Sequence, residues 1–583
     1  MERKKEMAGQ ADSGAIKGMD LLYEFEREPV SQDKLLPGKH FAGVFAGEHV
    51  AGTEFVIGAL FVTWGASVFD MFVGLLVGNL MAVLTWTFVC APIAVRTRLT
   101  LYWYLRRIAG PVTTTIYNVL NAVLFCILAG CMTTVSASAI RTVIGTERYP
   151  SWGIAPQVDW LPNDIRFVLI VVAVGAVVVA LAILGFKKLA QFSEICSPWM
   201  FLMFIAGAVV MLPRLAGQMF ASGRISSFAD FWELAHKSIW TGVAPAGNPQ
   251  MTFWHVAAFA WICNLAMHGG LSDMALLRYA KKSSYGLYSA FGMFLGHYLA
   301  WICAGTMGAG AAAALGVSLT QLDAGGVAWE ALGIGGIIAV ILAGWTTSNP
   351  TLYRAGLAFQ AVTPGWPRWL VTLTAGVATT AIACSPFVFK RLLDFVGLYG
   401  LLLMPVGAIV FVEHWIFPKL GFTQFWVWRR KLLVSWPALL SWVIAIAAAL
   451  ALQRTGTLHL FFLFVPVWLL TAVLYIIFSA MAGAREKFAP EPEQTEPSYS
   501  EQTPSSTQQP TEQTSKRDPV VWVCAIVALA SLVVCLALPL SVYLSPSSSY
   551  VKNHAAFKGL LLWPSLIYFI TATIWNIKRS KTS

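Results

Sequence analysis

The sequence predicts an all-α polytopic membrane protein, and three observations support this fold class. First, 57% of the 583 residues are hydrophobic and only 12% are charged, more apolar surface than a soluble fold of this size could bury. Second, runs of about 20 apolar residues recur, each long enough to cross about 30 Å of hydrocarbon as a helix. Third, two of these runs are interrupted in the middle by glycines and ionisable residues, which lipid alone does not tolerate.

The basic residues indicate which loops face the cytoplasm. The formal net charge of +11 could suggest nucleic-acid binding, but the basic residues lie in short loops that alternate along the chain. Cytoplasmic loops of membrane proteins carry such an excess of Lys and Arg. The pattern predicts contact with a lipid bilayer and not with nucleic acid. We expect a multi-pass protein of the cell membrane, inner or plasma, with both termini cytoplasmic. The clusters lie at 96–107, 187–188, 281–282, 429–431 and 578–581.

Signatures of catalysis are missing from the sequence. No HExxH, GxSxG or P-loop pattern occurs, so the sequence predicts neither an enzyme nor a cofactor. Nearly all of the nine cysteines lie inside apolar runs, and none has CxxC spacing. They are expected to be small buried hydrophobic residues and not disulfides or metal ligands.

Five spans follow a cytoplasmic N-terminal tail of residues 1–40. Span 2 contains GLLVGN, whose small residues allow neighbouring helices to approach closely. The loop after span 5 contains FADFWELAHKSIW, which predicts a short helix at the membrane interface. Spans 1–5 are predicted at 41–67, 69–93, 114–143, 167–184 and 189–212.

Nine further spans give an even total of about fourteen. Spans 6–12 complete a twelve-helix core of residues 41–482. Residues 483–519 are rich in Pro, Glu, Gln, Ser and Thr, and this linker is predicted to be disordered because it has little to bury. Residues 520–583 are predicted to form an accessory two-helix membrane hairpin with a basic tail. Spans 6–14 are predicted at 261–282, 287–312, 334–360, 369–384, 392–415, 433–452, 458–481, 520–544 and 559–577.

The two interrupted spans are the stretches most informative about function. Span 1 contains FAGVFAGEHVAGTEF, with Glu48 and His49 in mid-span beside glycines. Span 6 contains WICNLAMHGGLSDMALLRYAKK, in which His268 precedes two glycines. A charge at the centre of a membrane helix costs about 2.5–3.5 kcal/mol on insertion scales. Paired interruptions at matching positions in two halves of a chain indicate the binding site of a transporter.

The ionisable residues at these breaks have a functional and a structural interpretation. Glu48 and His49 are expected to contact a solute or to exchange a proton, because burial disfavours a charged carboxyl and histidine titrates near neutral pH. The alternative is an interfacial pair on a tilted helix. His268 is either part of the same site or a satisfied core histidine. Asp273 and Arg278 are expected to cap and anchor the cytoplasmic end of span 6.

Span 8 contains WTTSNP, whose side chains suit a cation or a polar solute. The hydroxyls of Thr346, Thr347 and Ser348 could supply oxygen ligands to Na⁺, together with carbonyls freed near Ala46 in span 1. Hydroxyls in membrane helices also bond back to their own backbone, which is the structural alternative. Asn349 precedes a proline expected to kink the helix, and its amide suits a heterocyclic or amide solute.

Several motifs occur in an order that points to a known family. They are GxxxGN in span 2, GFKKLAQFSEICSP before span 5, SD and RYAKK in span 6, TTSNPTLYRAGL in span 8 and LLMPVGAIVFVEHW in span 10. Over about residues 39–481 the chain resembles the nucleobase:cation symporter family, the relatives of cytosine permeases and the hydantoin transporter. The resemblance implies two five-helix inverted repeats of the leucine-transporter type, at about 41–212 and 253–416, and nucleobase-like cargo coupled to sodium or protons.

The aromatic positions depart from the family pattern. Relatives place tryptophan on spans 3 and 6 around a flat ring. Here an ungapped count puts Asn264 at the span 6 position, with Trp261 one turn away, and span 3 offers Phe125. The pocket is predicted between spans 1, 3, 6, 8 and 10 near the bilayer midplane. Its predicted lining is Glu48, His49, Phe125, Trp261, Asn264, His268 and Asn349.

Together these observations predict a symporter, a secondary active transporter of a small solute. Because Glu48 would repel an anion, the cargo is expected to be neutral or cationic, and nucleobase-like or otherwise nitrogen-containing. The coupling ion is expected to be H⁺ or Na⁺, with Glu48 favoured as the proton carrier. The alternatives are a transporter-like membrane sensor and a membrane-embedded metal enzyme. The sequence makes no prediction about the oligomeric state.

Overall fold

The computed structural model describes residues 24–144, 165–319, 322–385, 392–488 and 519–582, and their regular structure is helical. In these ranges ten helices are long and apolar enough to cross a membrane, or eleven if the bent pair in span 1 counts as one span. The predicted all-α polytopic fold is confirmed. The remaining three predicted spans fall outside that criterion: spans 6 and 9 contain helices of only 10 and 16 residues, and span 8 carries the polar WTTSNP segment.

The first five spans begin with a broken helix. Helices α2 and α3 are bent by 51° at a break of four residues, where the sequence predicts an interruption. Span 3 begins earlier than predicted, because the segment expected to be a loop is already helical from Leu101. A kink at Gly110, with φ of 76°, divides this helix from its membrane-spanning part. The helices are α2 (Gly38–His49), α3 (Glu54–Thr63), α4 (Leu75–Thr85), α5 (Ala91–Thr97), α6 (Leu101–Ile144), α7 (Ile165–Ile183) and α8 (Phe186–Met219).

The second five spans begin with another broken helix. Spans 6 to 10 correspond to α10–α12, α13, α15, α16 and α18, and α14 lies between spans 7 and 8. The predicted short helix after span 5 is present as α9. The bounds are α9 (Phe228–Leu234), α10 (Phe253–Ile262), α11 (Leu265–His268), α12 (Met274–Leu277), α13 (Leu299–Leu315), α14 (Ala324–Leu332), α15 (Ile334–Gln360), α16 (Arg368–Ala383) and α18 (Leu392–Phe411).

The break in span 6 comes earlier than the sequence suggests. The helix already ends at Ile262, and a second irregular stretch follows α11, where Leu271 has a φ of 65°. The two glycines lie in this second stretch. A Cβ at Gly407 of α18 would clash with the carbonyl oxygen of Gly269 and lie 3.1 Å from the Cα of Gly270, so this crossing requires glycine.

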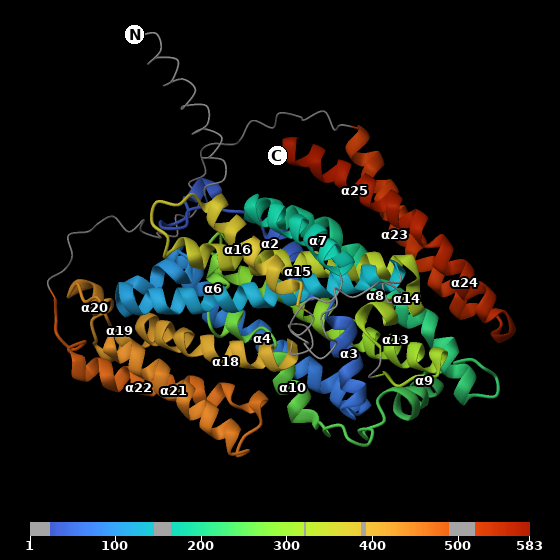
Figure 1. Cartoon of the computed structure of the whole chain (residues 1–583), viewed down its shortest axis with the longest axis horizontal. Helices are drawn as coiled ribbons and strands as arrows, with labels where there is room; N and C mark the ends of the chain where they lie inside the picture. Colours follow the sequence, from blue (N-terminus) through green and yellow to red (C-terminus); the bar gives the residue numbers. More distant parts are fainter. Residues whose placement is uncertain (1–23, 145–164, 320–321, 386–391, 489–518, 583) are drawn as a thin grey trace, which may run out of the picture.

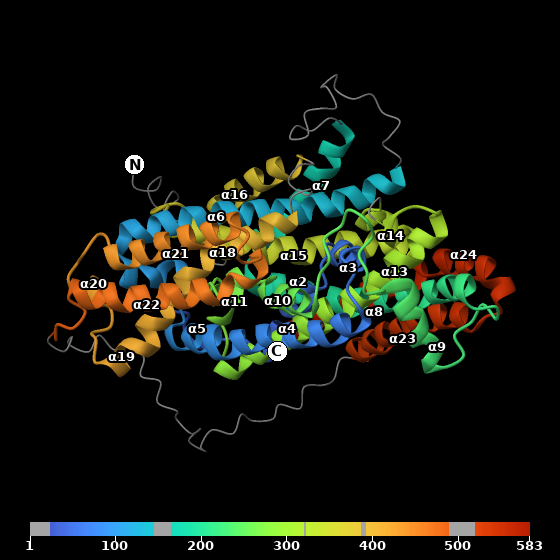
Figure 2. The same cartoon turned by 90° about the horizontal axis from the view of Figure 1, so that it is seen from below.

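The centre of the bundle is formed by α6 and α15, which lie side by side (Figure 1). Although Pro350 removes one backbone donor, α15 is a single helix from Ile334 to Gln360. The additional helices α21 (Trp436–Arg454) and α22 (Phe464–Ala482) lie on one side of the bundle, and α23 (Pro519–Leu544), α24 (Tyr550–Leu560) and α25 (Leu562–Thr582) lie on the other (Figures 1 and 2). The predicted disordered linker lies mostly outside the described residues.

Candidate functional site

A buried network of charged side chains joins the two broken spans to α15. The guanidinium of Arg354 donates to both carboxylate oxygens of Glu48, at 2.6 and 2.9 Å. It also donates twice to Oδ1 of Asp273, from Nε at 2.9 Å and from an Nη at 2.5 Å. Arg354 and Asp273 are 0% exposed and Glu48 is 3% exposed. Glu48 comes from the break in span 1 and Asp273 from the break in span 6, so Arg354 fixes one broken helix relative to the other.

Asp273 has a different role from the cap that the sequence suggests. It directly precedes α12 but makes no capping hydrogen bond to that helix. Its second oxygen instead accepts from the indole nitrogen of Trp86 in span 2, at 2.6 Å. Arg278, expected to anchor the end of span 6, is also fully buried. It donates to the backbone carbonyl of Phe25, at 2.6 Å, so it holds the segment that precedes span 1.

The network carries more negative than positive charge. Two carboxylates face one guanidinium, so the three groups have a formal charge of −1 when all are ionised. Bidentate pairing to arginine is the arrangement that best offsets the loss of hydration on burial. The remaining excess of negative charge disfavours an anion beside the network.

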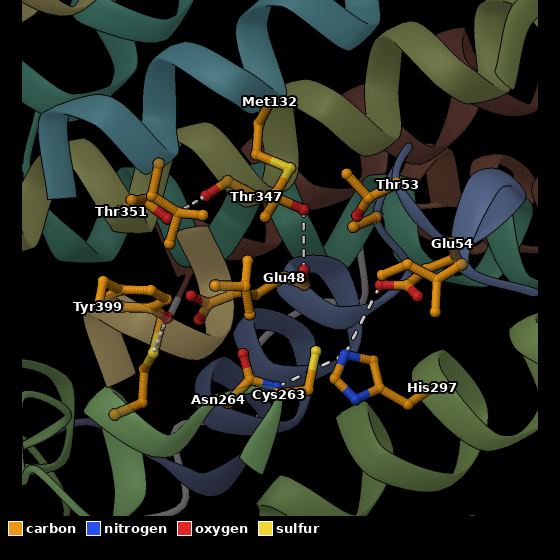
Figure 3. A pocket seen from close by; sticks show the side chains of 15 residues that line it. Glu48, Thr53, Glu54, Met132, Cys263, Asn264, His297, Thr347, Thr351 and Tyr399 are labelled. Carbon is orange, nitrogen blue, oxygen red and sulfur yellow. Dashed lines mark hydrogen bonds and ion pairs between the residues drawn. The ribbon is translucent and has the colours of Figure 1, made fainter. Parts of the chain in front are cut away.

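A small cavity of about 40 Å³ lies next to the network, and Glu48 belongs to both (Figure 3). Glu48, Thr347 and Asn264 contribute polar groups to its wall, and Leu128 and Met132 contribute apolar surface from α6. Spans 1, 3, 6, 8 and 10 all contribute, together with span 7. The lining residues are Glu48, Ala51, Thr53, Glu54, Ile57, Leu128, Met132, Cys263, Asn264, Met267, His297, Thr347, Thr351, Val396 and Tyr399.

A second acidic residue faces the same cavity. Glu54, the first residue of α3, is 2% exposed, and its Oε1 lies 3.6 Å from Nε2 of His297. The amide nitrogen of Asn264 lies 3.5 Å from the same imidazole nitrogen. Figure 3 shows the three side chains converging from the two broken spans and from the start of span 7.

The three consecutive hydroxyls of span 8 point to three different neighbours. Thr347 donates to the backbone carbonyl of Glu48, at 2.8 Å, and so bridges α15 to the break in span 1. Thr346 lies against Met200 of α8, and Ser348 donates to a carbonyl of α6. Thr346 and Thr347 also bond back to the carbonyl of Ala343, as the structural alternative expects. The carbonyl of Ala46 accepts from Val50, so it is not freed by the break.

Among the predicted pocket residues, Glu48 and Asn264 line the cavity and five others do not. His49 packs behind His297, with ring centres 5.1 Å apart, and its Nδ1 contacts the carbonyl of Phe45 at 2.7 Å. Phe125 lies behind Tyr399, which does line the cavity, in an edge contact of 6.0 Å.

The other three residues point elsewhere. Trp261 donates to the hydroxyl of Thr85 in α4, at 3.1 Å. His268 is fully buried; its Nε2 contacts the carbonyl of Trp261 at 2.9 Å, and its Nδ1 has no hydrogen-bond partner within the described residues. Asn349 is also fully buried, and within the described residues its amide has no hydrogen-bond partner.

Arg354, Glu54 and His297 are site residues that the sequence analysis did not identify. Arg354 stands within TTSNPTLYRAGL, read there only as a family motif, although an arginine in an apolar span is itself a functional signal. Glu54 lies six residues after Glu48 in the same interrupted span. In the part of the chain that the structure describes, no group of three or more His, Cys, Asp or Glu side chains is arranged to hold a metal ion.

Comparison with known proteins identifies the fold. No protein-family model matches the chain, and no curated protein is similar to it in sequence. Among solved structures, the chain is similar to Mhp1, a nucleobase-cation-symport-1 family transporter, in a closed conformation with bromovinylhydantoin bound. The TM-score is 0.60 and the identity 16%, over 80% of this chain and 98% of that one.

A second transporter has the same architecture. The chain is similar to a Na⁺-coupled sialic acid symporter in a substrate-bound outward-open state, with a TM-score of 0.55 and 13% identity, over 81% of this chain and 96% of that one. The inward-facing conformation of Mhp1 matches with a TM-score of 0.57. The inverted-repeat fold of the leucine-transporter type, expected from the sequence, is therefore the fold of this chain, and the solved structures named above that share it are those of a transporter and a symporter.

Proposed function

We propose that this protein is a symporter, a secondary active transporter that moves a small solute across the plasma membrane together with H⁺ or Na⁺. The observation that carries the proposal is the Glu48–Arg354–Asp273 network, which joins both broken spans to α15 beside a small cavity. Buried ionisable groups at helix breaks are costly in a membrane, and such groups mark transport pathways.

The charge of the site supports a neutral or cationic cargo. The network has an excess of negative charge, and Glu54 adds a second carboxyl to the cavity wall. The Asn264 amide can donate and accept hydrogen bonds, and the Thr351 hydroxyl, which donates to the carbonyl of Thr347, can still accept one; both suit a nitrogen-containing, nucleobase-like solute. A cavity of about 40 Å³ holds only a few water molecules, so the broken helices have to move apart to admit a ring.

Either coupling ion has candidate groups near the break in span 1. For sodium, the candidates are three neighbouring oxygens: the hydroxyl of Thr347 and the two backbone carbonyls to which it donates, those of Glu48 and Ala343. For a proton, the cavity offers the carboxyls of Glu48 and Glu54. The basic loops support an orientation with both termini in the cytoplasm.

Transport by the purified full-length protein tests the proposal. A thermal-shift screen of nucleobases, hydantoins, vitamins and amino acids, with and without Na⁺, identifies candidate solutes. Each is then offered to proteoliposomes under an imposed H⁺ or Na⁺ gradient. Accumulation that follows either gradient is the expected result. Binding without accumulation would favour the sensor, and transport indifferent to both gradients would contradict symport.

A further inference from the structure

Glu48 and Glu54 face the same cavity in different electrostatic environments. Both oxygens of Glu48 accept charge-assisted hydrogen bonds from Arg354. Glu54 has no arginine or lysine partner among the described residues, and its Oε2 is buried without a hydrogen-bond partner. A buried carboxylate without a cation costs several kcal/mol. Glu54 is therefore the acidic group of the cavity that gains most from a proton.

His297 is fixed in the position where it can share that proton. Its ring stacks on Trp301, with centres 4.3 Å apart and planes 14° apart, and is 3% exposed. Its Nε2 lies 3.6 Å from Glu54, an ion-pair distance that is too long for a direct hydrogen bond. Its Nδ1 has no partner within the described ranges. His297 belongs to a π-helical segment, Phe291–Tyr298, and such segments are frequent at functional sites.

This π-helical segment also connects the pair to the broken span. A Cβ at Gly296 would lie 2.5 Å from the carbonyl oxygen of His49, and one at Gly292 would lie 2.6 Å from its Nδ1. The segment therefore packs directly on the end of α2. A change in the bend between α2 and α3 would alter the separation of Glu54 from His297.

The surrounding elements present few other titratable groups to Glu54. Those that share the cavity are Glu48, Cys263 and Tyr399, and His49 lies behind His297. Of the helices that pack on α3, α13 carries Cys303 and α14 carries Glu330, which pairs with Lys558 at 3.6 Å. Of these groups, His49 lies against the pair itself, with its ring centre 5.1 Å from that of His297.

Two opposing effects make this proton exchangeable. Burial disfavours the ionised carboxyl, whereas the N-terminus of α3, where Glu54 is the first residue, favours it. When water reaches the cavity, hydration also stabilises the ionised carboxyl of Glu54, and the proton can leave. When the cavity closes and water is expelled, the pair is neutral only if it holds one proton.

We propose that Glu54 and His297 form the proton-binding site of the transport cycle. This inference rests on the proposed function and assigns its coupling ion. The pair takes up one proton from the outer side, either as Glu54 carboxylic acid beside neutral His297 or as carboxylate beside imidazolium. The cavity closes around the neutral pair, and the proton leaves to the cytoplasmic side after reopening. Glu48, held by Arg354, links this step to the broken helices without carrying the proton.

Proton binding can be measured without knowing the cargo. Proteoliposomes of the full-length protein are adsorbed on a solid-supported membrane, and the charge displaced by a rapid pH jump is recorded with no solute present. The wild-type protein is expected to give a transient current. Glu54→Gln is expected to abolish it, and Glu54→Asp is expected to restore it with a shifted pH midpoint. His297→Gln is expected to shift the midpoint and reduce the displaced charge.

Glu413→Gln is the matched control. Glu413 is also a fully buried carboxyl, but both its oxygens are hydrogen-bonded, to the Phe425 amide and the Tyr475 hydroxyl at 2.8 Å, and it does not line the cavity. The Glu413→Gln variant should retain the wild-type transient current. Each variant is compared only if it elutes as a single species after purification.

Two results would overturn the assignment. One is a transient current that persists in Glu54→Gln and disappears in Glu48→Gln, which would identify Glu48 as the proton-binding residue. The other is a wild-type protein that responds to a sodium jump but not to a pH jump. Neither result refutes symport, which fails only if no solute accumulates under either gradient.

Discussion

Arg354 determines whether two carboxylates can remain buried between the broken spans. Its fork donates to Glu48 and Asp273 at once, and the second oxygen of Asp273 is satisfied by Trp86. Such a network does not have to stabilise the folded protein overall, because the free energy needed to remove the charges from water offsets their mutual attraction. It does oppose any motion that separates α2, α15 and span 6 without a compensating charge. A cationic cargo or a proton is the kind of species that can supply that charge.

Arg354→Ala should be strongly destabilising. The substitution leaves two buried carboxylates without their cation, and breaking a buried pair in this way costs about 3–5 kcal/mol. Thermal unfolding in detergent, followed by light scattering, should show a large loss of stability. Arg354→Lys keeps the charge but loses the fork, so an intermediate loss is expected. Arg454→Ala, at an exposed arginine, is the control, and an equal effect there would contradict the prediction.

Glu48→Gln should uncouple transport without preventing binding. Glutamine keeps the shape of the side chain but removes the charge that makes the bidentate ion pair, so Arg354 holds α2 less firmly. The variant should bind solute and exchange it across proteoliposomes, yet fail to concentrate it. Counterflow and gradient-driven uptake measure the two activities separately. Normal accumulation under a proton gradient would show that Glu48 has no part in coupling.

At the scale of elements, the segment before span 1 closes one end of the bundle. The carboxylate of Glu24 accepts from the hydroxyls of Tyr279 and Tyr353, at 2.7 and 2.8 Å. Arg278 donates to the carbonyl of Phe25, and Glu26 lies 3.6 Å from Arg368. These contacts join the segment to spans 6, 8 and 9. Residues 24–36 are thus packed against the core, although the sequence analysis assigned all of residues 1–40 to a tail.

Removing residues 1–36 should open this end of the protein. Without Glu24, Phe25 and Glu26, the ends of spans 6 and 8 lose a shared partner, and water should reach the site from this side more often. A cysteine at Ala280, which is 1% exposed and pairs with Leu36, should then react several-fold faster with a maleimide. A cysteine at the exposed Lys419 should react equally in both proteins. Unchanged labelling at position 280 would show that the segment does not close the path.

At the scale of the whole molecule, the sequence predicts the fold better than the site. Apolar runs, basic loops and paired interruptions are local patterns, and each is readable without knowing its neighbours. The network depends on contacts between residues hundreds of positions apart, such as Glu48 with Arg354. Asn264 and Glu48 were found because they stand at the breaks themselves. Trp261 and His268 stand there too, but the rotation of short helices turns them away from the cavity.

The C-terminal helices α23–α25 pack along α8, on the side of the bundle opposite α21 and α22 (Figure 1). The contact includes polar bonds: Trp199 donates to Ser565 at 2.9 Å, and Tyr568 donates to the carbonyl of Ile195 at 2.7 Å. Asn576 donates to Glu194 at 3.4 Å, and Glu194 in turn pairs with His40 of α2. The hairpin therefore reaches the broken span through a single intermediate residue.

Ending the chain after Phe488 should nevertheless leave a folded protein that binds its solute. Lipid can replace the apolar surface of the hairpin, because membrane helices are not driven together by the hydrophobic effect. The loss is then a few interhelical hydrogen bonds, each contributing about 0.6 kcal/mol on average. Truncation at Phe488 also keeps the pairing of Arg430 with Glu486.

The truncated protein should elute as a single species, unfold at a modestly lower temperature and keep its thermal shift with solute. Because Glu194 loses Asn576, its transport rate should change more than its affinity. Loss of both folding and binding would show that the hairpin is an integral part of the core.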